Sequence, residues 1–302
     1  MSGAIDISGV TKSYGAIKAL DNVSLTVDGG LFGLIGPDGA GKSSLFRILA
    51  TLMSPDRGSA KVCGYDVVRD CRSIRTRIGY MPERFSLYPD LTVEENLNFF
   101  AALFGVRVKD NFDLIAPIFS QLAKFPHRRA GALSGGMKQK LALSCALIHR
   151  PDVLLLDEPT TGVDAVSRSE FWDMLASLKS KGITIFVSTS YMDEATRCDK
   201  IALIDRGRIL RINTPERLVD GLDEHLYNAS ADRMYDLLEA VRQLPEVTDC
   251  YTFGATLHLV TTGAFSANSA ISTLIAKGLT DVKIYPAKGD IEDLFIKLMK
   301  NG

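Results

Sequence analysis

Hydrophobic and polar residues alternate near the start of the chain, at Ile5, Ile7 and Val10 and again over residues 23–27. A period of two places every second side chain on the same face of a β-strand. The turn-forming residues 28–30 end the second alternating segment. The pattern therefore predicts a β-rich, antiparallel edge at the start of the fold.

Between Leu91 and about Arg129 the hydrophobic positions recur every three or four residues, as on one face of a helix. Thr92 with Glu95 three residues later is the pattern of a capping box, which marks the start of a helix. A further helix continues over residues 141–149. We expect these segments to form a helical insertion over about residues 91–145.

Short apolar strands are predicted at Val153–Leu156 and Ile183–Ser188, with an amphipathic helix around residues 171–178 between them. Strands that are apolar on both faces are typical of a parallel sheet covered by helices. The fold class predicted for residues 1–222 is therefore α/β, with a mostly parallel core sheet.

Beyond about residue 222 the order of elements changes. The patterns predict a strand, a helix, two strands, a helix, a strand and a last helix from Ile291. The order βαββαβ predicts a small α+β domain of ferredoxin-like type over residues 223–302. No motif marks its function, so a packing or dimer-contact role and a regulatory or ligand-sensing role both stay open.

Composition excludes several classes of protein. The 302 residues are 46% hydrophobic and 24% charged, as in a well-packed globular protein. The 35 Lys and Arg against 36 Asp and Glu give a net charge of −1, so no basic field indicates a nucleic-acid partner. Five scattered cysteines without C-x-x-C spacing favour reduced thiols in the cytosol. No apolar run approaches the length of a spanning helix, so the chain itself is not expected to cross a membrane.

Candidate chemistry first appears after the apolar strand 31–35, where residues 36–43 fit the pattern G-x-x-x-x-G-K-[ST]. Glycines let backbone N–H groups turn toward an anion, and the dipole of the following helix adds a favourable potential. We expect Lys42 to reach the β- and γ-phosphate oxygens of a nucleotide triphosphate and the Ser43 hydroxyl to bind Mg²⁺. The predicted phosphate loop consists of Gly36, Pro37, Asp38, Gly39, Ala40, Gly41, Lys42 and Ser43, with Ser44 following in the helix.

Two adjacent carboxylates, Asp157 and Glu158, end the apolar strand that begins at Val153. A carboxylate at the end of a buried strand requires a charged partner or a metal ion. We expect Asp157 to hold Mg²⁺ through its water shell. Glu158 is the candidate general base or water-orienting group for attack on the γ-phosphate.

A second glycine-containing loop, Ser134-Gly135-Gly136, lies immediately before a helix and is a second candidate anion site. With the phosphate loop upstream and Leu155-Leu156-Asp157-Glu158-Pro159 downstream, the sequence closely resembles the ATPase subunits of ABC transporters over about residues 4–220. The resemblance implies a P-loop NTPase fold of ABC type. It also implies that two such domains pack head to tail, with each ATP between one phosphate loop and the opposing Ser134-Gly135-Gly136.

Further positions match the family one at a time. Tyr14 falls where the family stacks an aromatic ring on adenine, although a strand-packing tyrosine remains an alternative. Asp164 falls in the loop that runs along the dimer interface. Glu83 stands where the family usually has glutamine, and its oxygens still suit Mg²⁺. Ser190 stands where the family usually has the histidine that positions the water and the γ-phosphate, so we expect slow hydrolysis at this chain's own site.

The stretches 85–97 and 191–195 resemble ATPases of bacterial exporters for drugs, antibiotics or lipid-like compounds. They are closer still to the N-terminal halves of tandem exporter ATPases, in which a serine-type half pairs with a histidine-type half. The resemblance implies an ATP-hydrolysing subunit on the cytoplasmic face of the inner membrane, paired with a second ATPase domain and driving a separate transmembrane permease. A homodimer and an asymmetric pair both stay possible, with the asymmetric pair favoured.

Two alternatives come from other classes of function. The chain could be an ATP-dependent regulatory module that leaves turnover to its partner, which Ser190 favours. It could also be an ABC ATPase that acts on ribosomes or DNA, although no basic extension supports that interpretation. For the apolar side chains of Phe85, Leu87 and Tyr88, docking of a helix from the permease and simple core packing both stay open.

Overall fold

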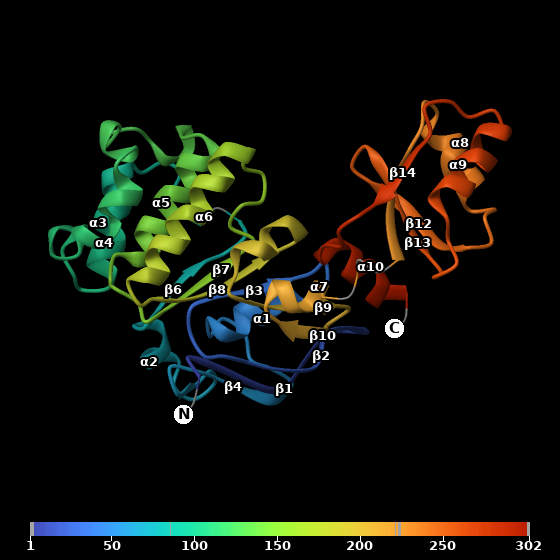
Figure 1. The fold of residues 1–302 in the computed structure, drawn as a ribbon. Coiled ribbons are helices and arrows are strands. Elements are labelled where there is room, and N and C mark those ends of the chain that lie inside the picture. Colours follow the sequence, from blue (N-terminus) through green and yellow to red (C-terminus); the bar gives the residue numbers. More distant parts are fainter. Residues whose placement is uncertain (1–2, 85, 221, 223–224, 301–302) are drawn as a thin grey trace. The chain divides into compact units, whose positions relative to one another are not determined.

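The computed structural model describes residues 3–84, 86–220, 222 and 225–300. The chain forms two compact units, Met1–Pro215 and Glu216–Gly302 (Figure 1). The short helix α7 (Pro215–Val219) lies at the division. The sequence pattern placed the border at residues 222 and 223, and residue 223 is outside the described residues.

The first unit begins with an antiparallel edge sheet. Its strands are β1 (Ile5–Tyr14), β2 (Ile17–Val27), β4 (Arg57–Val62) and β5 (Tyr65–Asp66), in the order β2-β1-β4-β5. Ile5 pairs with Val27 and Ile7 with Leu25, and all four side chains are buried. The alternating pattern near the start of the chain therefore predicted these strands correctly.

The central sheet carries the candidate chemistry at its strand ends. Its order is β10-β9-β3-β8-β7-β6, and all neighbours are parallel except β10 and β9. The mostly parallel core sheet is thus confirmed. Its strands are β3 (Leu31–Ile35), β6 (Ile78–Met81), β7 (Val153–Asp157), β8 (Thr184–Thr189), β9 (Lys200–Asp205) and β10 (Arg208–Asn213).

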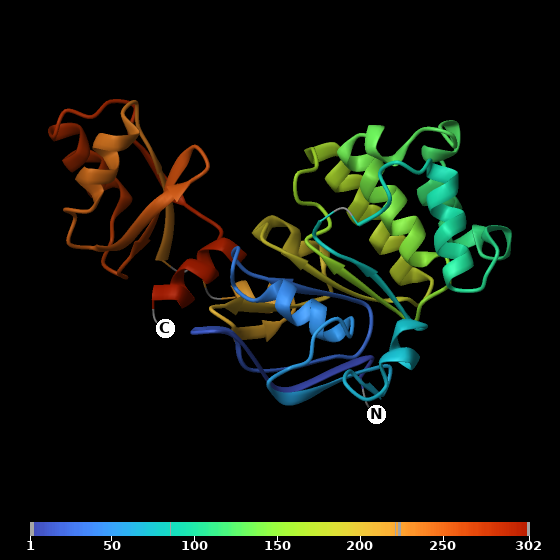
Figure 2. The same ribbon diagram turned by 180° about the vertical axis from the view of Figure 1, so that it is seen from behind.

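Helices cover both faces of the central sheet (Figure 1 and Figure 2). On one side lie α3 (Val93–Leu103), α4 (Phe112–Phe119), α5 (Gly135–Leu147) and α6 (Ala165–Ser180), and on the other side lies α1 (Lys42–Leu49), between the central and edge sheets. The rings of Phe46 in α1 and Phe186 in β8 stack with centroids 4.8 Å apart in this buried core. Shorter helical segments are α2 (Cys71–Arg75) and the 3₁₀ turns Val108–Asp110, Leu122–Lys124, Ala130–Ala132 and Met192–Arg197.

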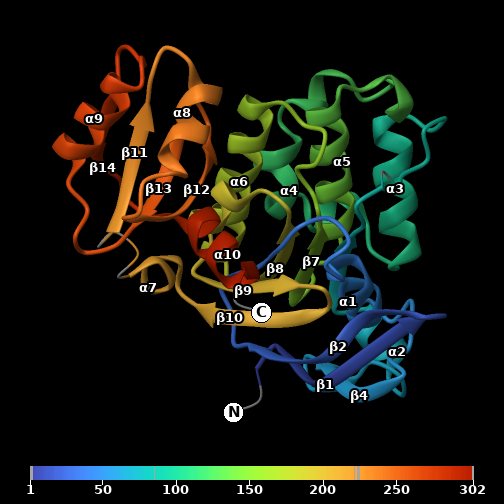
Figure 3. The ribbon, with the colours of Figure 1, turned by 90° about the vertical axis from the view of Figure 1, so that its right-hand side faces the viewer.

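The second unit is a four-stranded antiparallel sheet with helices (Figure 3). The sheet order β12-β13-β11-β14 and the chain order βαββαβ are those of a ferredoxin-like domain, as the sequence predicted. Leu237, Val241 and Leu274 of the helices pack with Leu257 and Leu259 of β13 in a separate core. Its elements are β11 (Leu226–Ser230), α8 (Met234–Val241), β12 (Val247–Phe253), β13 (Thr256–Thr261), α9 (Ala267–Ala276), β14 (Lys283–Pro286) and α10 (Ile291–Lys300).

A buried asparagine fastens the entry of the helical insertion. The capping box forms as predicted, since Glu95 N donates to Thr92 Oγ1 and Thr92 N donates to the Glu95 carboxylate. Asn96, with no exposed surface, then accepts from Tyr88 N and donates to the carbonyl oxygens of Tyr88, Leu91 and Thr92. One side chain therefore links four backbone groups of the loop that precedes α3.

We predict that Asn96→Ala destabilises the first unit by about 1–3 kcal/mol, because the substitution removes the acceptor of Tyr88 N and the amide bonds to the three carbonyl oxygens. Trp172 is the single tryptophan of the chain and is buried in α6, so its fluorescence during urea denaturation reports on this unit alone. Asn98→Ala, at an exposed position of the same helix, should change stability by less than about 0.5 kcal/mol. Equal effects of the two substitutions would show that the hydrogen bonds of Asn96 contribute nothing.

Candidate functional site

Three parallel strands of the central sheet end at one edge and bring the predicted residues together. The phosphate loop follows β3, Asp157 ends β7 with Glu158 directly after it, and Ser190 follows β8. Gly36 N donates to Thr189 O at 3.3 Å, so the loop begins directly beside the end of β8. The site is therefore built by strand ends that are far apart in the sequence.

Backbone geometry explains two glycines of the loop. Gly41 has φ +106°, and a Cβ atom there would lie 2.3 Å from Ala19 O, so the loop would have to move for any other residue. Gly39 also has a positive φ, of +79°, but a Cβ atom there would meet nothing within 4 Å. The loop thus packs tightly on one side and is open at its tip, as a cradle for an anion requires.

Lys42 lies under this loop and is 4% exposed. Its ammonium donates to Gly36 O at 2.5 Å and Pro37 O at 2.9 Å, and lies 2.8 Å from Glu158 Oε1. An ammonium group has three protons, and three oxygens surround this one. The loop carbonyls and Glu158 therefore hold the cation at the base of the cradle.

Asp157 connects the loop with β8. Its Oδ1 accepts from Ser43 Oγ at 3.1 Å and from Ser188 Oγ at 2.9 Å. Burial raises the pKa of the Asp157 carboxyl above its ordinary value of 3.8, the two hydroxyls oppose this, and the charges of Glu158 and Glu83 add to it. Asp157 thus places a buried carboxylate oxygen beside a serine hydroxyl, and oxygen donors of this kind suit a hard divalent cation.

Glu158 adopts a left-handed backbone angle, φ +51°, which is rare for a residue with a side chain. Its N–H donates to Ser188 Oγ at 3.0 Å. Its Oε2 accepts from Thr161 Oγ1 at 3.1 Å, from Ser190 N at 3.1 Å and from Ser190 Oγ at 3.3 Å. Glu158 and Ser190 are therefore in direct contact. The serine side chain is short, but its hydroxyl still reaches the Glu158 carboxylate.

The remaining residues predicted at this cluster lie around it. Tyr14 is partly exposed, and its hydroxyl lies 3.3 Å from Ser44 Oγ in the first turn of α1. Glu83 is exposed, and its charge acts on the carboxyl of Asp157. In the loop, Asp38 is exposed at the tip, Pro37 is partly buried and Ala40 is buried.

Ser134, Gly135, Gly136 and Asp164 lie at two helix starts. Ser134 caps α5, accepting from Met137 N at 3.4 Å, so the two glycines lie in the first turn of the helix and not in a loop before it. Asp164 caps α6 by accepting from Ser167 N at 3.0 Å, and this bond holds the pKa of its carboxyl below the ordinary range. The capping bonds of Ser134 and Asp164 therefore hold their own helix starts and do not join them to the cluster around Lys42.

The sequence pattern did not identify Ser188 as a site residue. Its hydroxyl bridges Asp157 and the backbone of Glu158. The available signal was a polar residue at the end of an apolar strand beside two carboxylates. Serine is one of the commonest residues in proteins, so the pattern alone did not distinguish it.

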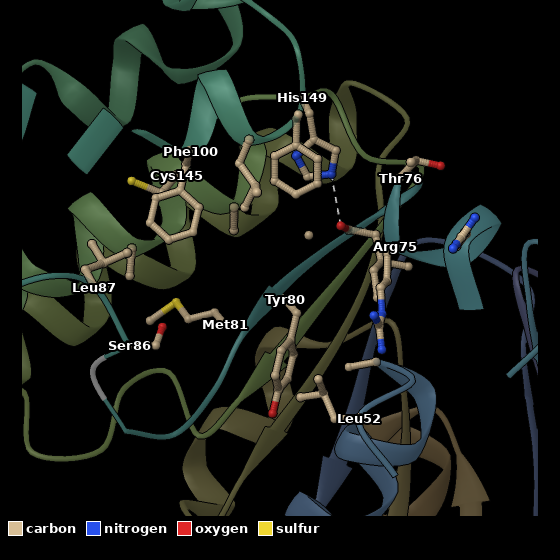
Figure 4. A pocket seen from close by; sticks show the side chains of 18 residues that line it. Leu52, Arg75, Thr76, Tyr80, Met81, Ser86, Leu87, Phe100, Cys145 and His149 are labelled. Carbon is tan, nitrogen blue, oxygen red and sulfur yellow. Dashed lines mark hydrogen bonds between the residues drawn. The ribbon is translucent and has the colours of Figure 1, made fainter. Parts of the chain in front are cut away.

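A largely apolar cavity of about 790 Å³ lies between the helical insertion and the end of β6 (Figure 4). Leu87, Phe100 and Cys145 line it on the helical side, and Tyr80 and Leu52 line it on the sheet side. Burial raises the pKa of Tyr80 to about 12.

The three apolar residues for which the sequence left helix docking and core packing open, Phe85, Leu87 and Tyr88, differ in their position at this cavity. Leu87 is buried in the wall of the cavity and Tyr88 is exposed beside it, whereas Phe85 is outside the described residues.

Among the described helices, none has both the length and the apolar composition needed to span a bilayer.

The model of the ABC transporter family matches residues 20–161. "Probable multidrug ABC transporter ATP-binding protein YbhF" of Escherichia coli is 38% identical over 98% of this chain, which spans only 52% of that protein. Nod factor export ATP-binding protein I of Burkholderia lata is 35% identical over 97% of this chain and 96% of its own length.

Solved structures agree with these sequence relatives. The ATP-binding subunit of an ABC transporter superposes with a TM-score of 0.65 at 27% identity, covering 71% of this chain and 91% of its own. A dimeric post-hydrolysis state of the ATP-binding cassette MJ0796, bound to ADP and Pi, gives a TM-score of 0.63 at 25% identity, over 70% of this chain and 98% of that one.

The raised pKa of Asp157 has a consequence for stability. Because the folded protein holds the proton of this carboxyl more tightly than the unfolded chain does, the stabilisation is present below the unfolded pKa and is lost as pH rises through the folded pKa. We therefore predict that Asp157→Asn, which keeps an oxygen for the two serines, raises the free energy of unfolding at neutral pH. The gain should shrink as pH falls toward the ordinary carboxyl range.

Urea denaturation followed by Trp172 fluorescence between pH 8 and pH 4 measures this difference. Asp152→Asn is the matched control, because Asp152 precedes the same strand but is exposed and pairs with Arg77 at 3.0 Å. It should change stability by less than about 0.5 kcal/mol. A loss of stability in Asp157→Asn at pH 8 would contradict the electrostatic interpretation.

Proposed function

The chain belongs to the ABC transporter family and carries its ATPase domain, and we propose that it is the ATP-hydrolysing motor subunit of a membrane exporter. In this role it binds MgATP and drives a separate transmembrane subunit. The export direction is supported by the relative named for Nod factor export, of whose own length 96% matches this chain.

The observation that carries this proposal is the cluster of Lys42, Ser43, Asp157, Glu158 and Ser190 at one sheet edge. It places a cation and a hydroxyl on the carboxylate of Glu158 and a second hydroxyl on the adjacent carboxylate of Asp157, beside the phosphate loop. Phosphoryl transfer needs this set of groups, because its catalysis consists mainly of positioning and charge stabilisation. Tyr14 ends β1 with its hydroxyl 3.3 Å from Ser44 Oγ of α1, and its ring would stack on the adenine.

The donor set also fits Mg²⁺, which prefers oxygen ligands and keeps several waters. Ser43 and Asp157 would hold the ion, with Glu83 close enough to act on the same carboxyl. The ion would neutralise the charge of the phosphates. Glu158 would take the proton of the attacking water, and Ser190 would orient that carboxylate.

Two partners follow from the proposal. Ser134, Gly135 and Gly136 form a helix N-terminus whose N–H groups suit the γ-phosphate held by a second ATPase domain, and Asp164 lies in the adjoining loop before α6. The cavity beside Leu87 and Phe100 is apolar and large enough for side chains of a coupling helix from the transmembrane subunit. The chain would therefore act at the cytoplasmic face of a membrane.

A second candidate function is the regulatory half of an asymmetric ATPase pair. The contact between Ser190 and Glu158 favours it, because a serine hydroxyl that reaches only the carboxylate supplies no donor to the γ-phosphate. Hydrolysis would then occur mainly at the site that this chain completes with Ser134-Gly135-Gly136.

We predict that Glu158→Gln lowers the rate of phosphate release by about 10²–10⁴-fold while ATP binding is retained, because the amide keeps an acceptor oxygen but cannot take a proton. Malachite-green assays give the rate, and isothermal titration calorimetry gives the affinity for MgATP. The variant should also accumulate as an ATP-dependent dimer, with itself or with its partner subunit, on a sizing column.

Lys42→Ala should lose MgATP binding, and Lys61→Ala, on the exposed edge sheet, should not. This pair separates a failure to bind from a failure to hydrolyse. Full turnover in Glu158→Gln, or unchanged affinity in Lys42→Ala, would rule out the proposed site.

Ser190→His tests the second candidate. If the missing donor limits hydrolysis, we expect the rate at this chain's own site to rise by up to about 10²-fold. Single-turnover hydrolysis in the assembled complex, with the partner's phosphate-loop lysine substituted, isolates that site. Ser190→Ala removes the hydroxyl donor but keeps the backbone N–H donor to Glu158, so it should not raise the rate. A rate that stays the same or falls in Ser190→His would mean that the serine arrangement is already competent.

A further inference from the structure

Glu194 is a buried carboxylate outside the cluster around Lys42. It lies in the 3₁₀ turn Met192–Arg197 after β8 and is 3% exposed. A buried carboxylate costs free energy unless hydrogen bonds or charges compensate it. Burial raises the pKa of Glu194, so the hydrogen bonds around the carboxylate compensate its loss of hydration only in part.

The hydrogen bonds of Glu194 join two loops of the candidate site. Its Oε2 accepts from Thr189 Oγ1 at 2.5 Å and from Thr160 Oγ1 at 3.2 Å. Thr189 ends β8 directly before Ser190, and Thr160 follows Glu158 by two residues. One oxygen atom therefore ties the segment that carries Ser190 to the segment that carries Glu158.

The segments joined in this way set the geometry of Glu158. Ser190 from the first segment and Thr161 from the second both donate to Glu158 Oε2. The carbonyl oxygen of Thr189 also accepts from Gly36 N, at the start of the phosphate loop. A shift between the two segments would therefore change the position of Glu158 relative to the loop.

The other oxygen of Glu194 faces a cation. Arg168 Nε lies 3.8 Å from Glu194 Oε1, and the same guanidinium binds Asp193 at 3.2 Å and covers the ring of Tyr191. Asp193 is the neighbouring carboxylate on the same turn, and it also faces Arg168. Unlike Glu194, it is exposed, and its side-chain hydrogen bond joins it to Arg168 and not to the two threonines. This difference supplies a matched control.

We infer that Glu194 is a positioning residue for hydrolysis: its carboxylate holds Thr160 and Thr189 together and thereby fixes Glu158 and Ser190 against the phosphate loop. The inference rests on the proposed function of Glu158. It assigns to Glu194 an effect on turnover, which a residue that only stabilises the fold would not have.

The test compares Glu194→Ala, Glu194→Gln and Asp193→Asn in the protein with its transport partners. Glu194→Ala should lower kcat for ATP by about 10–100-fold, because small displacements of a catalytic group have effects of that size. KM and the calorimetric affinity for MgATP should stay within about two-fold, because Lys42 and Ser43 keep their contacts. Glu194→Gln keeps an oxygen for both threonines and should restore most of kcat, and Asp193→Asn should behave as wild type.

Threonine variants remove the same link without touching the carboxylate. Thr160→Val and Thr189→Val should each lower kcat, and neither should lower it further when combined with Glu194→Ala, because the residues act as one unit. These conservative variants also keep the test decisive if Glu194→Ala does not fold.

Two failures can be told apart. If the wild type hydrolyses ATP through Glu158 but Glu194→Ala and the threonine variants keep wild-type kcat, the inference about Glu194 is wrong and the proposed function stands. The inference is also wrong if every loss of kcat matches an equal loss of folded protein, or if Asp193→Asn has the same effect. A wild type whose hydrolysis does not depend on Glu158 overturns the proposed function and this inference with it.

Discussion

The contact between Lys42 and Glu158 is the constraint on which the candidate site depends. Both groups are almost fully buried, and they lie 2.8 Å apart. Removing one member of such a pair leaves an uncompensated charge in a medium where it is poorly solvated. The strands that precede them, β3 and β7, must therefore end at the same edge of the sheet, and their parallel arrangement on either side of β8 provides this.

The same constraint explains the surrounding hydroxyl groups. Asp157, next to Glu158, adds a second buried carboxyl group, and burial raises its pKa. Serine and threonine side chains can donate to these carboxylates without adding charge. Ser43, Ser188, Thr161 and Ser190 each donate to one of the two. Neutral donors thus hold both carboxylates, Glu158 at the Lys42 ammonium and Asp157 next to it in the chain, without adding positive charges that would compete for a phosphate group.

Much of the fold was predictable because burial imposes a period on the sequence. The alternation in β1 and β2, the capping box at Thr92 and the order βαββαβ all appear in the structure as expected. The phosphate loop was predictable because its glycines have a geometric requirement. Contacts between distant segments were not, since no local pattern indicates that Ser188 bridges Asp157 and Glu158 or that Glu194 joins Thr160 to Thr189. The helical position of Gly135 and Gly136 was also missed, because glycine normally signals a loop.

The left-handed backbone of Glu158 sets a limit on how stable this protein can become. A residue with a side chain in that region costs on the order of 1–3 kcal/mol, and neighbouring bonds must hold it there. Glycine at this position would relax the backbone but would remove the carboxylate. With the role proposed for Glu158, selection for thermal stability and selection for turnover act in opposite directions on this one residue, so a more heat-resistant form of the chain has to gain its stability elsewhere in the fold.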